Sequence, residues 1–207
     1  MSELVTRVLV SPGELVLERG GARHVPLLVA LIAVSAMAFG AATGARTGGA
    51  QLVFAALKMP AVLLVPLLIA VPAARAVASV YGWQVSFEQA VLAGTVGAAR
   101  TAVVAAALAP AVWLIGDVSS YGGAKAIVAM ALLFSGAVGL PVVARGLVPS
   151  EADWRPGLRA TACALAVLVV FGAVAAQTGW LLRPFVVSPT ETVEFLRGGG
   201  GHIGLGL

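Results

Sequence analysis

The sequence predicts an all-α integral membrane protein, a polytopic bundle of about five transmembrane helices. Hydrophobic residues make up 60% of the 207 residues and charged residues 11%, whereas a soluble domain carries about 25% charge. The apolar residues gather in continuous runs, each about as long as the roughly 20 residues that a helix needs to cross a bilayer. A transmembrane β-barrel would instead alternate polar and apolar residues along strands of about 10 residues.

Residues 1–24 precede the first apolar run and predict a cytoplasmic amphipathic segment. Four apolar residues fall on one face of a short helix: Leu4, Val5, Val8 and Leu9. The sequence Ser11-Pro12-Gly13-Glu14 is typical of a second helix start, with the serine as cap and the proline in the first turn. We expect this segment to lie on the membrane surface, and a partly ordered tail is the alternative.

Five spans are expected at residues 25–45, 59–80, 90–115, 124–144 and 160–182. They form one transmembrane domain over residues 25–187. A short helix and a Gly-rich tail are expected after it, over residues 188–207. A linker long enough to separate a second domain is not visible in the sequence.

The second span carries two local signals. Lys58 interrupts the apolar run that starts at Gln51, so we expect a separate short amphipathic helix before Lys58, at the membrane interface. Pro60, Pro66 and Pro72 then predict that the second span is bent and packed inside the bundle, because each proline removes a backbone donor.

Small residues and helix starts give the remaining local expectations. Ser86 is followed by an acidic residue in the next turn, and this pattern predicts the start of the third helix. Glycines inside the spans allow helix backbones to approach closely. The glycines expected at such contacts are Gly40, Gly44, Gly94, Gly97, Gly136 and Gly139.

The positive charges predict a cytoplasmic N-terminus. An odd number of spans places the two termini on opposite sides of the membrane. Arg19 and Arg23 precede the first span, and Arg145, Arg155 and Arg159 surround the longest loop, which favours these segments on the inner side. The high Ala, Val and Gly content indicates a GC-rich bacterial genome, so the expected location is the cell inner membrane.

Five charged or polar residues in or beside the spans are candidates for polar or lipid contacts: Arg75, Glu88, Arg100, Gln177 and Arg183. An ionisable group inside a membrane is a functional hypothesis by default. Three interpretations remain open for the arginines. They extend to the headgroups, Arg75 pairs with Glu88 across the turn at 81–83, or they bind lipid phosphate. Gln177 and its neighbour Thr178 are expected to form interhelical hydrogen bonds.

The motifs that would identify an enzyme are incomplete, so we expect no catalytic, cofactor or metal site. Ser135 precedes a glycine as in the rhomboid serine motif, but the first glycine and a partner histidine are missing. Asp117 follows a glycine as in intramembrane aspartyl proteases, but a second aspartate in a span is missing. The single cysteine, Cys163, excludes an internal disulfide and is expected to be a small core residue.

The stretch Tyr81-Gly82-Trp83-Gln84-Val85-Ser86-Phe87-Glu88-Gln89-Ala90, with Pro110 late in the next span, resembles Yip1-like membrane proteins. The resemblance covers about half of the chain. It implies five closely spaced spans and an adaptor or organiser that works through protein and lipid contacts, and it carries over no catalytic residue. The stretch from Gln177 to Phe185 is similar to one in uncharacterised bacterial multi-pass proteins.

The expected function is a non-enzymatic membrane subunit, scaffold or adaptor. Its expected partners are the lipid bilayer and other membrane proteins or a second copy of the chain. Nucleic acid is not among them, because a basic run with interleaved aromatics is missing. The alternative is a small transporter or channel with a polar pathway near Arg75, Arg100 and Gln177, although five spans do not divide into two equal inverted halves.

Overall fold

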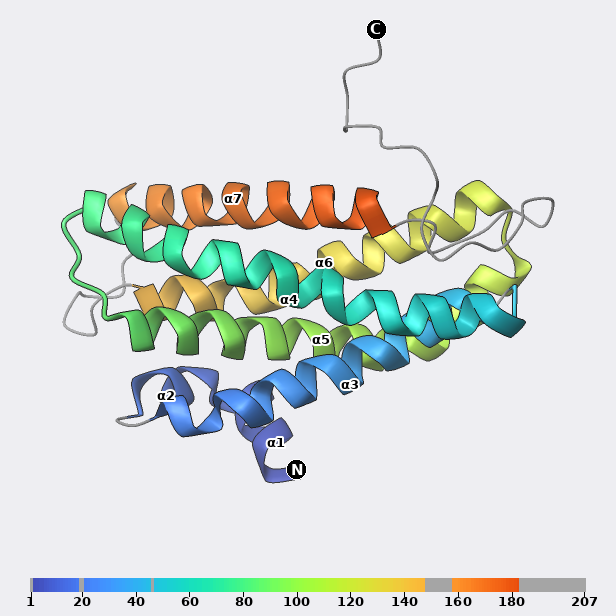
Figure 1. Cartoon of the computed structure of the whole chain (residues 1–207), viewed down its shortest axis with the longest axis horizontal. Helices are drawn as coiled ribbons and strands as arrows, with labels where there is room; N and C mark the ends of the chain where they lie inside the picture. The colour runs from blue at the N-terminus through green and yellow to red at the C-terminus, as the bar shows by residue number, and fades with distance from the viewer. Residues whose placement is uncertain (1, 19–20, 46, 148–157, 183–207) are drawn as a thin grey trace, which may run out of the picture.

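The computed structural model describes residues 2–18, 21–45, 47–147 and 158–182, and the elements in these ranges are all helical. In chain order they are α1 (Ser2–Val10), α2 (Pro12–Leu17), the short 3-10 helix η1 (Gly21–His24), α3 (Val25–Gly44), α4 (Gly49–Val80), α5 (Phe87–Val118), α6 (Tyr121–Leu147) and α7 (Leu158–Leu182) (Figure 1). The five helices α3 to α7 are long and apolar enough to cross a membrane. The predicted all-α, multi-pass architecture is therefore confirmed.

Most helix ends agree with the spans expected from the sequence. Helix α3 begins at residue 25 as expected, while α5 and α6 extend a few residues beyond the apolar runs at both ends. Ser86 caps α5 as predicted, because its Oγ accepts a hydrogen bond from the backbone N–H of Gln89 at 3.1 Å. Ser11 precedes α2, but its side chain makes no capping hydrogen bond.

The prediction of a separate short helix before Lys58 is wrong, because residues 49–80 form one continuous helix. Gln51, Ala55 and Lys58 are all buried, and their spacing places them on one face of α4. Lys58 therefore lies on the packed side of the helix and does not mark its end. The helix contacts α3, α5 and α7, so its predicted position inside the bundle is confirmed.

The five long helices lie side by side, with successive helices running in opposite directions (Figure 1). Helix α5 packs against α3 and α6, and α4 packs against α3 and α7. Helices α6 and α7 are neighbours along the described chain, yet they touch each other much less than these pairs do. The weak contact between α6 and α7 leaves space between them.

Glycines bring α3 and α4 together, as the sequence predicts. A Cβ added at Gly40 would fall on the backbone of Ala55, and one added at Gly44 would lie 2.7 Å from the carbonyl oxygen of Gln51. Backbone atoms cannot move aside as a flexible side chain can. These two positions therefore require glycine at this helix spacing.

Glycines also set the packing of α5, with one exception among the expected positions. A Cβ added at Gly97 would lie 3.2 Å from the carbonyl oxygen of Gly139, and one at Gly94 would lie 2.9 Å from Val71. Gly136 was expected at a similar contact, and this expectation is wrong. A Cβ added there would meet no atom within 4 Å, because this face of α6 is turned to open space.

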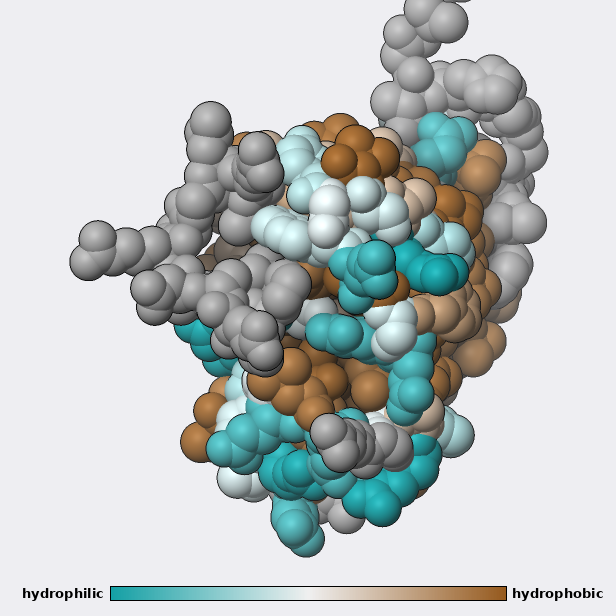
Figure 2. Space-filling model, turned by 90° about the vertical axis from the view of Figure 1, so that its left-hand side faces the viewer, coloured by the Kyte–Doolittle hydropathy of each residue, from teal (hydrophilic) through white to brown (hydrophobic). Residues whose placement is uncertain are grey.

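The N-terminal helices pack against one end of the bundle. Val8 of α1 and Leu15 and Val16 of α2 are buried, and both helices contact α5. Figure 2 looks onto this end of the molecule, where hydrophilic residues gather over the apolar bundle. The amphipathic segment thus covers the end of the helices with its apolar face.

Candidate functional site

A cavity of about 1190 Å³ lies between α4, α5, α6 and α7. We call it the groove. Small-molecule pockets have volumes of roughly 300–1,000 Å³, so the groove is large for a bundle of this size. Helices α6 and α7 form its two sides, and their weak contact keeps it wide.

The lining of the groove is almost entirely apolar. Thr101, Tyr121 and Lys125 are its polar or charged residues, and Lys125 is the one that carries a charge. The hydroxyl of Thr101 donates to the carbonyl of Gly97 in its own helix at 3.0 Å. Its hydrogen is therefore already used and is not offered to a ligand in the groove. The groove therefore suits an apolar guest along most of its length.

Lys125 and Tyr121 lie together at the start of α6. The Nζ of Lys125 is 3.9 Å from the centroid of the Tyr121 ring, a cation–π distance. Lys125 is exposed, and within the described part of the chain it makes no ion pair. The sequence alone predicts no site at Lys125, because a lysine near a helix end commonly extends to the headgroups.

Three glycines leave open space along the two sides of the groove. They are Gly136 on α6 and Gly172 and Gly179 on α7, and a Cβ added at any of them would meet no atom within 4 Å. Close helix packing does not explain these glycines. They widen the groove.

The candidate residues from the sequence do not converge on the groove. Arg75 and Glu88 are both exposed, and the described residues show no ion pair between them. Arg75, Arg100 and Gln177 do not line the groove. Arg183 lies outside the described residues.

The other polar residues inside the spans have separate environments. The Nε of Arg100 is buried, and the described residues offer it no hydrogen-bond partner. The hydroxyl of Thr178 donates to the carbonyl of Val174 at 2.8 Å, within α7, whereas an interhelical hydrogen bond was expected of Thr178. Cys163 is buried in α7, and the predicted core position is confirmed.

Lys58 is a buried charge that sequence reasoning missed. Its relative exposure is 1%, and Gln51, about two helical turns earlier on the same face, is fully buried. The sequence treated Lys58 as a boundary because it follows a short apolar run. The seven-residue spacing from Gln51 is the signal that could have placed both on one packed face.

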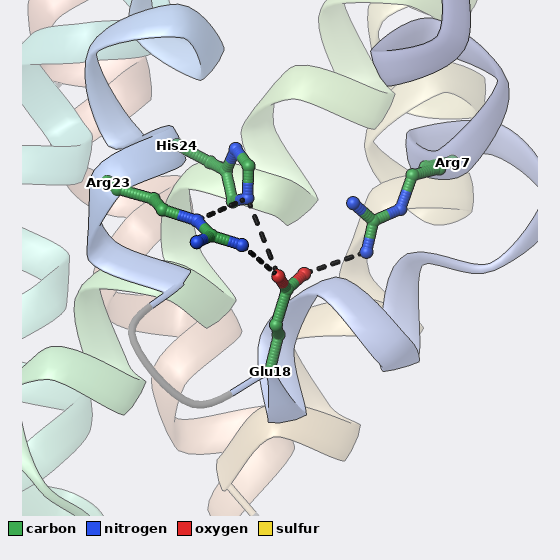
Figure 3. A network of polar contacts seen from close by, with 4 residues as sticks. All are labelled: Arg7, Glu18, Arg23 and His24. Atoms are coloured by element: carbon green, nitrogen blue, oxygen red, sulfur yellow. Dashed lines mark hydrogen bonds and ion pairs between the residues drawn. The ribbon is translucent and has the colours of Figure 1, made fainter.

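A cluster of charged residues joins the N-terminal helices to the start of α3 (Figure 3). The carboxylate of Glu18 accepts hydrogen bonds from Arg7 and Arg23, each at 2.7 Å, and its Oε1 lies 3.7 Å from Nε2 of His24. The hydrogen bond from Arg7 lowers the pKa of Glu18 most, desolvation opposes it, and Arg23 lowers the pKa further, so it lies below the ordinary 4.5.

Compared with known proteins, the chain matches no family model, no curated protein and no solved structure. The site must therefore be interpreted from its own geometry. The chemistry of the groove is that of an apolar binding site with one cationic end.

Proposed function

We propose that the chain is a non-enzymatic membrane subunit or scaffold that binds another membrane component along the groove. The observation that carries this proposal is the extent of the groove. Its α6 lining includes Lys125 and Val143, which are 18 residues apart, or about 27 Å at 1.5 Å per residue. That length approaches the roughly 30 Å of a bilayer's hydrocarbon core.

Transport of a polar solute has less support. A polar pathway needs groups that can replace water around the solute, and the sequence offered Arg75, Arg100 and Gln177 for this role. None of these residues lines the groove. The alternative of a transporter or channel would have to use another route through the bundle.

We further propose that the N-terminus is cytoplasmic and that the membrane is a bacterial inner membrane. Arg7 and Arg23 lie at the end of the bundle that α1 and α2 cover. Arg75 near the end of α4 and Arg145 in the last turn of α6 belong to the same end. Such a concentration of arginines is typical of the cytoplasmic side. The Yip1-like resemblance supports the same kind of adaptor role.

Site-specific photo-crosslinking in native membranes tests the binding function. A photoreactive residue replaces Leu168, which lines the groove, or its neighbour Val169, which is 68% exposed and lies outside the groove. We expect a discrete crosslinked product from position 168 and only diffuse lipid labelling from position 169. The same pattern of products from both positions would contradict the proposal.

A further inference from the structure

We infer that the groove binds the acyl chains of an anionic phospholipid, whose phosphate contacts Lys125. This inference rests on the proposed function, since it names the membrane component that occupies the groove. It follows from the distribution of charge, the geometry around Lys125 and the open space beside the glycines.

The distribution of charge matches an amphipathic ligand with one anionic end. Every lining residue except Thr101, Tyr121 and Lys125 is apolar. Tyr121 and Lys125, whose polar groups make no hydrogen bond within the described part of the chain, lie at one end of the α6 lining. A ligand that fits must therefore be apolar for most of its length and carry its negative charge at that end. A membrane phospholipid has this shape and this chemistry.

The geometry around Lys125 suits a phosphate. The ammonium group lies 3.9 Å from the ring centroid of Tyr121, which limits the positions that the long side chain adopts. An ammonium has three donors, and the tyrosine hydroxyl adds another donor beside it. Lysine binds phosphate mainly as a point charge, and the described residues offer Lys125 no competing carboxylate partner.

The space for the acyl chains lies against bare backbone. Gly136, Gly172 and Gly179 present no side chain to the groove, and in the described structure a Cβ added at any of them meets no atom within 4 Å. Lipid tails are as apolar as the lining, so moving a tail from the bilayer into the groove gains little from the hydrophobic effect. The headgroup contact with Lys125 must therefore decide which lipid binds.

A transmembrane helix of another protein is the competing occupant. A helix would exploit the same small residues, but it does not require a cation at one end of the groove. Lys125 is exposed on the groove wall, and the described residues offer it no ion-pair partner, which favours the lipid.

Native mass spectrometry of the purified full chain tests the headgroup contact. The probes are phosphatidylglycerol and phosphatidylcholine with identical acyl chains, added in equal amounts. We expect the wild type to retain phosphatidylglycerol several-fold more than phosphatidylcholine, and Lys125→Gln to lose this preference. Arg75→Gln is the matched control, because it removes an exposed cation that does not line the groove.

A second pair of variants tests where the tails lie. Gly172→Phe fills the groove and is expected to reduce binding of both lipids several-fold. Val169→Phe adds the same ring to the outer face of the same helix and leaves binding unchanged. Should Gly172→Phe not fold, as judged by circular dichroism and gel filtration, Gly136→Leu fills the groove from α6 instead.

Three results would overturn the inference. They are equal retention of the two lipids by the wild type, equal effects of Lys125→Gln and Arg75→Gln, and unchanged binding when the groove is filled. A crosslink from position 168 to a protein, without lipid, would overturn the inference and leave the proposed binding function intact. If position 168 yields no discrete crosslinked product, the result would contradict both the inference and the proposed binding function.

Discussion

Gly40 lies where the backbones of α3 and α4 approach closely, and its replacement tests the importance of that contact. In Gly40→Ala the new methyl group would fall on the carbonyl oxygen of Ala55. The two helices must separate, and we expect a loss of stability of about 1–3 kcal/mol, as for overpacked cores. The measurement is the unfolding free energy in mild detergent.

The control is Gly116→Ala, because a Cβ at Gly116 meets no atom within 4 Å. Alanine is a better helix former than glycine by up to about 1 kcal/mol, so this variant should be at least as stable as the wild type. Equal destabilisation by the two substitutions would show that close approach at Gly40 is unimportant.

Arg100 provides a second prediction for a single residue. Its Nε is buried without a hydrogen-bond partner among the described residues, and such an orphaned donor costs about 1–3 kcal/mol. We expect Arg100→Leu to raise the unfolding free energy in detergent, and Arg75→Leu, at an exposed site, to change it less. A clear loss of stability in Arg100→Leu would mean that its guanidinium makes an essential contact.

Individual residues differ in how much of their role the sequence reveals. The contacts of Gly40 and Gly44 follow from small residues four apart, a pattern of neighbouring residues in the chain. The role of Lys125 depends on which helices stand opposite it, and its own neighbours in the sequence do not encode this. Gly136 shows the same limit, because a glycine that opens a groove has the same sequence signal as one that closes a contact.

The attachment of α1 and α2 to the bundle should depend on pH through Glu18. Its pKa is lowered below 4.5, chiefly by the hydrogen bond from Arg7. A carboxyl group with a lowered pKa stabilises the folded state at pH values above its unfolded pKa. This contribution is lost as the pH falls through the folded pKa. The attachment should therefore be complete at pH 7 and weaken below about pH 4.5.

Amide hydrogen exchange of residues 2–17 measures this attachment. After correction for intrinsic rates, we expect protection in α1 and α2 to fall between pH 6 and pH 3.5 while protection in α5 persists. Glu18→Gln should lower protection at pH 6 and remove most of the pH dependence, because its amide does not titrate, carries no negative charge and has one acceptor oxygen in place of the two that bind the arginines in Figure 3. An unchanged pH profile in Glu18→Gln would rule out this mechanism.

Among the elements, α4 shows where sequence reasoning fails. A lysine and a proline close together indicate a helix boundary, yet α4 continues through Lys58 and Pro60. The face formed by Gln51, Ala55 and Lys58 packs inside the bundle, and tertiary packing therefore overrides the local signal. The cap at Ser86 was predictable because the hydrogen bond to Gln89 is local.

For the whole molecule, the number and order of the long helices follow from the lengths of the apolar runs. The groove does not follow from them. Helices that are apolar on all sides carry no periodic signal to show which face meets a neighbour and which faces lipid. The low contact between α6 and α7 is a property of the assembled bundle, so only the structure reveals it.

The orientation of the whole bundle gives the last prediction. With the N-terminus in the cytoplasm, the turns at Thr47 and Ser120 face outward and the turn at Gln84 faces inward, since successive helices cross in opposite directions. Single cysteines at these three exposed positions, in a Cys163→Ala background, are treated with a membrane-impermeant maleimide. In intact cells we expect labelling of Thr47→Cys and Ser120→Cys, and labelling of Gln84→Cys only after permeabilisation. The opposite pattern would place the arginine-rich end outside, against the rule on which the orientation rests, and labelling of all three positions in intact cells would contradict a membrane-spanning bundle.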